Sequence, residues 1–216
     1  MWMIVGKCSN GSASLTSSQR SFVQLTQFPH QAHKNAATFG ADNAAVYTMG
    51  GSAGATIALS LANRAIRDQQ LKSALKGVVA VVPATVHRHN VPSEYKSLYE
   101  EFTKEAATAP FIDVESVDFF YDEAGLDPND STYFALLAKK NHSQFPPTYI
   151  VSCEYDPLRA DAHLLKKALQ DSGVEVKHDE FGGLPHYFWM FPQLPETASF
   201  GQTLLAGIEW VKGQVQ

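Results

Sequence analysis

The stretch VYTMGGSAGATIALSLANRAI, residues 46–66, decides the fold of this chain. Its first four residues are a short apolar run typical of a strand, and Gly50-Gly51 end that run. A helical pattern begins directly behind the glycines, because apolar residues recur every three to four positions. We therefore expect a strand over residues 46–49, a tight turn and an amphipathic helix. Its apolar stripe consists of Ile57, Leu61 and Ala65, with Ala58, Ala62 and Ile66 beside them.

The alternation of strand and helix continues towards the C-terminus. Residues 77–83 (GVVAVVP) are apolar on both faces, as in a parallel strand covered on both sides, and residues 148–153 (TYIVSC) are similar. Residues 161–172 follow a helical pattern, and residues 174–181 alternate like a half-exposed edge strand. A last helix begins near Ala198. This order predicts an α/β fold with a mostly parallel sheet flanked by helices.

Two segments depart from this alternation. The first 30 residues are rich in Ser and Thr between Ser9 and Ser21, which is typical of a loop, so we assign residues 1–30 to an atypical N-terminal segment and 31–216 to one domain. An insertion over about residues 84–144 has a helical pattern and many aromatic side chains. We expect it to pack as a lid over the carboxyl ends of the strands.

Composition narrows the class of protein. The chain has 216 residues, of which 44% are hydrophobic and 18% are charged, and a chain of this length can bury a core. Its net charge of −5 argues against a nucleic-acid partner. No apolar run of about 18 residues predicts a membrane span, and Met1–Val5 is too short for a signal-peptide core. Because Cys8 and Cys153 cannot form a disulfide framework, we expect a reduced, cytoplasmic protein, and self-association stays open.

Residues 50–54 (GGSAG) match the pattern G-x-S-x-G, which places a serine on a sharp turn from strand to helix. The hydroxyl of Ser52 would then be exposed as a nucleophile, and the small residues Gly50 and Gly54 would let strand and helix approach closely. The helix N-terminus, beginning with the N–H of Ala53, would face developing negative charge. Gly51 completes the turn. The bare pentapeptide is common, so the strand before it and the helix behind it carry the prediction.

A serine nucleophile needs a base, and the base needs an acid that orients it. Asp156 follows the strand over residues 148–153 and is the candidate acid, with Glu154 as the local alternative. His186 lies in the loop after the next strand and is the candidate base. The order Ser52, Asp156, His186 is the one in which this type of site occurs along the chain. A turn carboxylate and a structural loop histidine are the simpler interpretations of the last two residues.

The remaining histidines give no pattern of metal ligands. His30 and His33 are three positions apart, and His87 and His89 are two apart, but no cysteine or carboxylate cluster completes a site, so we expect no metal. We interpret the other histidines as surface residues or as residues with satisfied hydrogen bonds: His142, His163 and His178. The aromatic run over residues 187–189 is more typical of packing than of substrate contact.

Three segments together, residues 50–54 (GGSAG), 156–161 (DPLRAD) and 185–188 (PHYF), resemble the hormone-sensitive-lipase branch of the α/β-hydrolases. The likeness runs from Lys34 to the C-terminus and is strongest to fungal members that act in polyketide pathways. It implies hydrolysis of short-chain carboxylic esters of small molecules through an acyl-enzyme, without a cofactor. The resemblance assigns Ser52 as nucleophile, Asp156 as acid and His186 as base.

The chain departs from this family before the serine. The family has an HGGG-type loop whose N–H groups form part of the oxyanion hole, and no glycine cluster precedes Gly50 here. We therefore expect an N-terminally shortened or rearranged member in which Ala53 N–H is the remaining donor. The strand over residues 46–49 should become an exposed edge, and we hypothesise that Met1–Val5 pairs with it.

Two other functions stay open. The missing loop is also compatible with a binding protein that has kept the fold and lost turnover, as in the plant gibberellin receptors that resemble this branch. Acyl transfer to an acceptor other than water would use the same three side chains. The complete set of nucleophile, acid and base favours ester hydrolysis.

Overall fold

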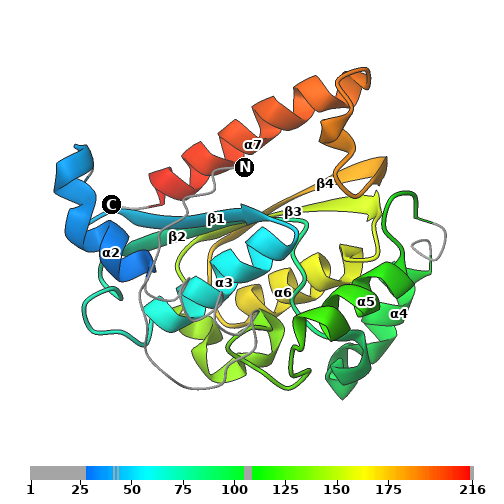
Figure 1. Ribbon diagram of the computed structural model, residues 1–216, viewed down its shortest axis with the longest axis horizontal. Coiled ribbons are helices and arrows are strands. Elements are labelled where there is room, and N and C mark those ends of the chain that lie inside the picture. Colours follow the sequence, from blue (N-terminus) through cyan, green and yellow to red (C-terminus); the bar gives the residue numbers. More distant parts are fainter. Residues whose placement is uncertain (1–27, 41, 43, 105–108, 215–216) are drawn as a thin grey trace.

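A computed structural model describes residues 28–214 except 41, 43 and 105–108 (Figure 1). The serine-rich stretch over residues 9–21 and the hypothetical strand Met1–Val5 lie outside the described residues. The described chain begins with α2 (Phe28–Asn35) and a 3₁₀ turn, η1 (Ala36–Phe39).

Four strands form one sheet in the order β1-β2-β3-β4. They are β1 (Val46–Gly51), β2 (Leu75–Val81), β3 (Thr148–Tyr155) and β4 (Val176–Pro185), and every neighbouring pair is parallel. The carboxyl ends of all four strands therefore meet at one edge of the sheet. The predicted α/β fold class is confirmed.

Helices cover both faces of the sheet (Figure 1). On one face α3 (Ala53–Ala65) and α6 (Arg159–Asp171) share a core with the sheet, to which Leu59, Val78 and Leu165 contribute. On the other face α7 (Pro195–Gly213) packs through Phe200 and Val211. Alternate residues of β2 and β3 point into each core, which explains why their sequences are apolar on both faces.

The α7 helix lies very close to the sheet. A Cβ atom at Gly207 would be 1.9 Å from the ring of Tyr149, so only glycine allows this approach. One turn later, Val211 packs against Gly77. A Cβ atom at Gly77 would lie 2.1 Å from a methyl group of Val211. These contacts hold α7 across the centre of the sheet.

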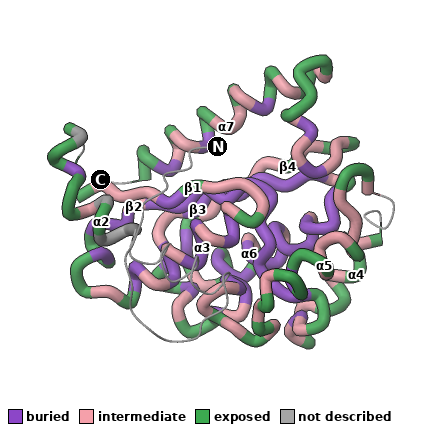
Figure 2. Tube along the Cα trace, in the orientation of Figure 1, coloured by how far each residue is buried: buried purple, intermediate pink, exposed green. Residues whose placement is uncertain are grey.

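The two outer strands are less buried than the two inner ones. β2 and β3 are buried along almost their whole length, whereas β4 is half-exposed and Met49 of β1 is 53% exposed. Figure 2 shows the buried centre of the sheet and the exposed outer side of α7. Within the described part of the chain, β1 pairs with β2 alone and β4 with β3 alone, so these two strands form the edges of the described sheet.

The insertion between β2 and β3 packs beside α6. Its α4 (Lys96–Thr103) lies against α6 through a core that includes Val86 and Leu164, and α5 (Val114–Ala124) buries Tyr121 against Phe134 (Figure 1). Short 3₁₀ turns complete it: η2 (Arg88–Asn90), η3 (Ser93–Tyr95), η5 (Ala135–Leu137) and η6 (Lys139–Gln144). The domain boundaries and the role of this insertion as a lid stay predictions.

Several elements differ in detail from the sequence pattern. In α3 the predicted stripe is only partly right, because Ile57 and Leu61 are half-exposed while Ala55 and Leu59 are fully buried. Small residues face the sheet there, so the larger apolar ones do not mark the buried face. The last helix begins earlier than predicted, at Pro195, whose fixed φ suits a first helical turn.

Within the described residues, we find no helix with the length and apolar character needed to cross a membrane.

Candidate active site

Ser52 sits at the turn between β1 and α3. Its backbone has φ 53° and ψ −125°, a conformation that costs a non-glycine residue roughly 1–3 kcal/mol. Its N–H donates to the carbonyl of Val81 at 2.8 Å, which ties the turn to the end of β2. The carbonyl of Ser52 accepts the first helical hydrogen bonds, from Ala55 and Thr56. The strain is therefore held by hydrogen bonds on both sides of the serine.

The two outer glycines of the G-x-S-x-G pattern have different roles. A Cβ atom at Gly50 would lie 2.1 Å from the carbonyl oxygen of Gly54, whereas a Cβ at Gly54 would meet nothing within 4 Å. The close approach predicted from the motif thus depends on the absent side chain of Gly50 and on the backbone of Gly54. Gly51 lies beside Tyr187, since a Cβ there would be 3.0 Å from the phenol oxygen.

Three sequence-predicted residues meet at the carboxyl edge of the sheet. His186 Nε2 lies 3.0 Å from Ser52 Oγ, and His186 Nδ1 lies 2.7 Å from Asp156 Oδ2. Asp156 and His186 are 1% and 3% exposed. Because a carboxylate can only accept, the Nδ1–H donates to Asp156, which leaves Nε2 as an acceptor for the serine hydroxyl. This arrangement gives a hydroxyl, an imidazole and a carboxylate in one continuous hydrogen-bonded chain.

The acid is fixed by its own loop. Asp156 Oδ1 accepts the N–H of Leu158 at 2.8 Å, so both carboxylate oxygens have partners. The alternative acid, Glu154, instead accepts the N–H of Gly183 at 2.6 Å and ties β3 to the end of β4. The geometry therefore favours Asp156 over Glu154 as the partner of His186.

Ala53 is the first residue of α3, directly behind Ser52. The first N–H groups of a helix have no acceptor within that helix, and they carry the positive end of its dipole. Ala53 is exposed and follows Ser52 directly, so the first N–H of α3 belongs to the residue next to the candidate nucleophile. The geometry is compatible with the oxyanion contact that the sequence predicts for this residue.

Asp161, near the start of α6, holds the start of the insertion in place. Its Oδ1 accepts the backbone N–H groups of Thr85 and Val86 at 2.6 and 3.0 Å, which ties the start of the insertion to α6. Burial raises the pKa of Asp161 to about 7, although these two backbone hydrogen bonds oppose the shift. The carboxyl group therefore belongs to the frame of the site rather than to its reacting atoms.

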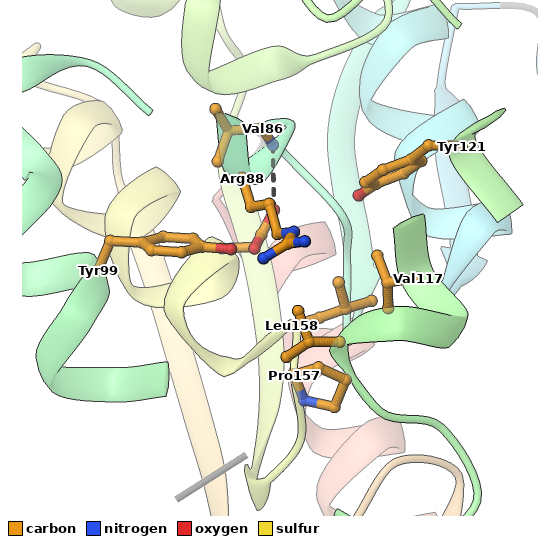
Figure 3. Close-up of a pocket in the computed structure, with 9 residues that line it drawn as sticks. Val86, Arg88, Tyr99, Val117, Tyr121, Pro157 and Leu158 are labelled. Carbon is orange, nitrogen blue, oxygen red and sulfur yellow. Dashed lines mark hydrogen bonds between the residues drawn. The ribbon is translucent and has the colours of Figure 1, made fainter. Parts of the chain in front are cut away.

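A small pocket lies next to Asp161, on the α4 and α5 side of the acid loop (Figure 3). Tyr99 and Arg88 point toward each other across it, and Leu158 forms part of its wall. None of the three hydrogen-bonded residues of the candidate site lines this pocket. This pocket is therefore separate from the candidate site and lies beside the loop that carries Asp156.

The other residues singled out by sequence have packing roles in the structure. The ring of His87 packs on Tyr121, and burial lowers the pKa of His87. His142 lies 2.9 Å from the carbonyl of Ala135. In η7 (Phe188–Met190), Phe188 is fully buried and Trp189 stacks on Phe200 at 4.1 Å.

Cys153 is a buried free thiol near the end of β3, and burial raises its pKa well above the usual range. A thiol in this state is a poor nucleophile and a poor metal ligand.

Two features escaped the sequence interpretation. Tyr187 has φ 59° directly after the candidate base, and its phenol lies against Gly51. The residue type gives no signal for this, because a tyrosine in a left-handed conformation is uncommon. Away from the candidate site, His163, His178 and Glu180 place potential metal ligands within 4.8 Å of one another, whereas the sequence predicts both histidines to be surface residues or residues with satisfied hydrogen bonds.

The chain resembles known proteins over most of its length. A family model described as alpha/beta hydrolase fold matches residues 23–190. Versiconal hemiacetal acetate esterase of Dothistroma septosporum is 50% identical over 182 residues, which are 84% of this chain and 56% of that protein.

Solved structures agree on the fold. Vibralactone cyclase superposes with a TM-score of 0.82 at 29% identity, covering 94% of this chain and 59% of the other. The thermostable carboxylesterase EstE1, cloned from a metagenomic library, superposes with a TM-score of 0.70 at 22% identity, covering 95% and 65%. The chain spans little more than half the length of these relatives.

Proposed function

Because the chain belongs to the alpha/beta hydrolase fold family, we propose that it hydrolyses carboxylic esters with Ser52 as nucleophile. The observation that carries this proposal is the hydrogen-bonded chain from Ser52 through His186 to Asp156. The similarity to a fungal protein named as an esterase supports the same class of reaction. This unbroken series of hydrogen bonds favours a catalytic site over a binding protein that has lost turnover.

In the first half of the reaction, Ser52 Oγ attacks the ester carbonyl carbon while His186 Nε2 accepts the hydroxyl proton. The carbonyl oxygen becomes an anion in the tetrahedral intermediate. When the carbon–oxygen bond to the alcohol breaks, His186 returns the proton to the leaving oxygen, and an acyl-serine remains. The carboxylate of Asp156 stabilises the imidazolium that exists between these two proton transfers.

In the second half, water takes the place of the alcohol. His186 accepts a proton from the water as its oxygen attacks the acyl-serine, and the same proton returns to Ser52 Oγ when the acid leaves. We assign the N–H of Ala53 as one donor to the oxyanion in both halves. Because a missing oxyanion donor typically costs about 10²- to 10³-fold in kcat, a second donor would strongly affect the rate.

The proposed substrate is an ester of a short acyl group. The basis is the name of the fungal relative, which specifies an acetate ester. A small-molecule substrate also fits the sequence composition, which disfavours nucleic acid. The chain would need no cofactor for this reaction, because serine, imidazole and water provide all the groups that form and break bonds.

The test is hydrolysis of p-nitrophenyl acetate, butyrate and octanoate by the purified chain. Ser52→Ala and His186→Ala should each lower kcat by at least about 10³-fold. Ser199→Ala is the matched control, because that hydroxyl is exposed and donates to the carbonyl of Glu196. Hydrolysis that persists in Ser52→Ala at the wild-type rate would contradict the proposal.

A second outcome of the same acyl-serine is transfer to a hydroxyl group instead of water. The solved relative named a cyclase gives a reason to examine the products as well as the rate. Adding a primary alcohol to the assay separates the two outcomes, since transfer forms a new ester at the expense of free acid.

A further inference from the structure

We propose that His163, His178 and Glu180 form a binding site for a divalent transition-metal ion of the zinc type, which ties β4 to α6. Each residue offers one ligand atom, and the three atoms lie within 4.8 Å of one another. His178 and Glu180 are two positions apart on β4, so their side chains project from the same face of the strand. His163 reaches them from α6, which covers that face.

The ligand atoms converge around the hydroxyl of Ser152, on the neighbouring strand β3. Ser152 Oγ lies 2.8 Å from His178 Nε2 and 3.0 Å from Glu180 Oε2. Glu180 Oε2 in turn lies 2.5 Å from His163 Nε2. A tetrahedral ion bound at about 2.0–2.2 Å needs ligand atoms that are farther apart than Glu180 Oε2 and His163 Nε2 are here. Small side-chain rotations would separate these two atoms enough to admit the ion.

The surrounding contacts hold the ligands in place. Arg159 donates to both carboxylate oxygens of Glu180, from Nη2 to Oε1 at 2.8 Å and from Nε to Oε2 at 3.1 Å, and Oε2 is the oxygen that also lies against His163. The ring of Phe102 stacks on His163 at 3.9 Å and fixes its orientation. Such outer contacts typically orient metal ligands and contribute about 10- to 100-fold to metal affinity.

The ligand types select the ion. Two imidazole nitrogens and one carboxylate oxygen suit Zn²⁺ and its neighbours, whereas Mg²⁺ and Ca²⁺ prefer oxygen ligands alone. Ser152 or a water molecule would supply the fourth ligand. When the ion binds, the hydrogen between His163 Nε2 and Glu180 Oε2 is released to solvent as a proton, and both histidines bind the ion through the lone pair of Nε2 with their ring hydrogen on Nδ1.

The location suggests a consequence. β4 ends at Pro185, directly before His186, and α6 begins at Arg159, three residues after Asp156. An ion bound between them would connect the strand that leads to the base with the helix that follows the acid. The proposal does not depend on ester hydrolysis, because its tests measure metal binding and stability.

The experiment is a calorimetric titration of the EDTA-treated chain with Zn²⁺, with thermal unfolding measured alongside. We expect one ion per chain and a rise in Tm that saturates with Zn²⁺ and does not occur with Mg²⁺. His163→Gln and His178→Gln should each weaken Zn²⁺ binding at least about tenfold and remove the Tm shift. His89→Gln is the matched control, because its exposed ring pairs with Asp118 in the insertion, away from the cluster.

A second measurement uses Co²⁺ and requires no variant. Visible bands of a tetrahedral Co²⁺ site without a thiolate charge-transfer band would support the assignment. A thiolate band would place the ion on cysteine and overturn it. Two further results would overturn the assignment. One is an unchanged Zn²⁺ affinity in a folded double variant that carries both His163→Gln and His178→Gln. The other is no Zn²⁺ binding by the wild-type chain.

Discussion

The backbone of Gly50 at the end of β1 lies so close to Gly54 in the first turn of α3 that a methyl group on Gly50 would be 2.1 Å from the Gly54 carbonyl oxygen. Because Ser52 lies midway between them, this contact sets how sharply the chain turns at the serine. The left-handed φ of Ser52 is a consequence of the same turn.

Gly50→Ala should therefore push α3 away from β1, lower Tm and reduce ester hydrolysis at least about tenfold. Gly54→Ala is the matched control, since its Cβ would meet nothing within 4 Å and alanine is favoured over glycine in a helix. Circular dichroism melts and initial rates measure both effects. Equal losses in the two variants would show that the close approach does not matter.

Asp156→Asn should lower kcat by about 10³- to 10⁴-fold, because an amide at this position no longer fixes the Nδ1–H tautomer of His186. Glu154→Gln should lose much less, since Glu154 bonds Gly183 rather than His186. Steady-state kinetics of the two variants decide between the carboxylates. A larger loss in Glu154→Gln would move the acid role to that residue.

Asp161→Asn should make the chain more stable at neutral pH and change the pH dependence of its stability. Burial holds the pKa of Asp161 at about 7 in the folded chain, against an ordinary value of 3.8. Between these pH values the folded state binds more protons than the unfolded state, so the wild-type free energy of unfolding falls as pH rises. The amide removes this loss, which is of the order of a few kcal/mol.

Urea unfolding of wild type and Asp161→Asn from pH 4 to pH 8 measures this difference. The stability of the variant relative to wild type should increase with pH and level off above about pH 7. Asp171→Asn serves as control, because that carboxylate is exposed on the last turn of α6. A difference that is constant with pH would mean that Asp161 is ionised throughout.

Gly207→Ala should destabilise the chain by displacing α7 from the ring of Tyr149, whereas Gly201→Ala on the same helix should be neutral or stabilising. A loss of roughly 1–3 kcal/mol is typical of overpacking in a core. Chemical unfolding of both variants measures the contrast. Similar stability of the two would indicate that α7 packs differently.

Sequence predicted the parts of the fold that local pattern determines. The sequences of β2 and β3 are apolar on both faces, which predicted buried strands, because helices cover both faces of the sheet there. The alternating sequence of β4 predicted an edge strand, because one side of that strand is exposed. The turn at Ser52 was readable because its glycines, its strand and its helix are adjacent in sequence. The order of Ser52, Asp156 and His186 then pointed to residues that the structure brings within hydrogen-bond distance.

Other features depend on contacts between distant segments. His163 and Glu180 are 17 positions apart, and only the packing of α6 on β4 brings them together. Asp161 looks like an ordinary residue of a first helical turn until the insertion folds back and covers it. Tyr187 adopts its left-handed backbone because its neighbours are fixed in the core, a constraint that its own residue type opposes.

The most direct test of the account is labelling of the purified chain with a fluorophosphonate, followed by intact-mass measurement. We predict one adduct per chain, lost in Ser52→Ala, strongly slowed in His186→Ala and retained in Ser199→Ala. No adduct on a folded chain, or an adduct that survives Ser52→Ala, would contradict the claim that Ser52 is a nucleophile activated by His186.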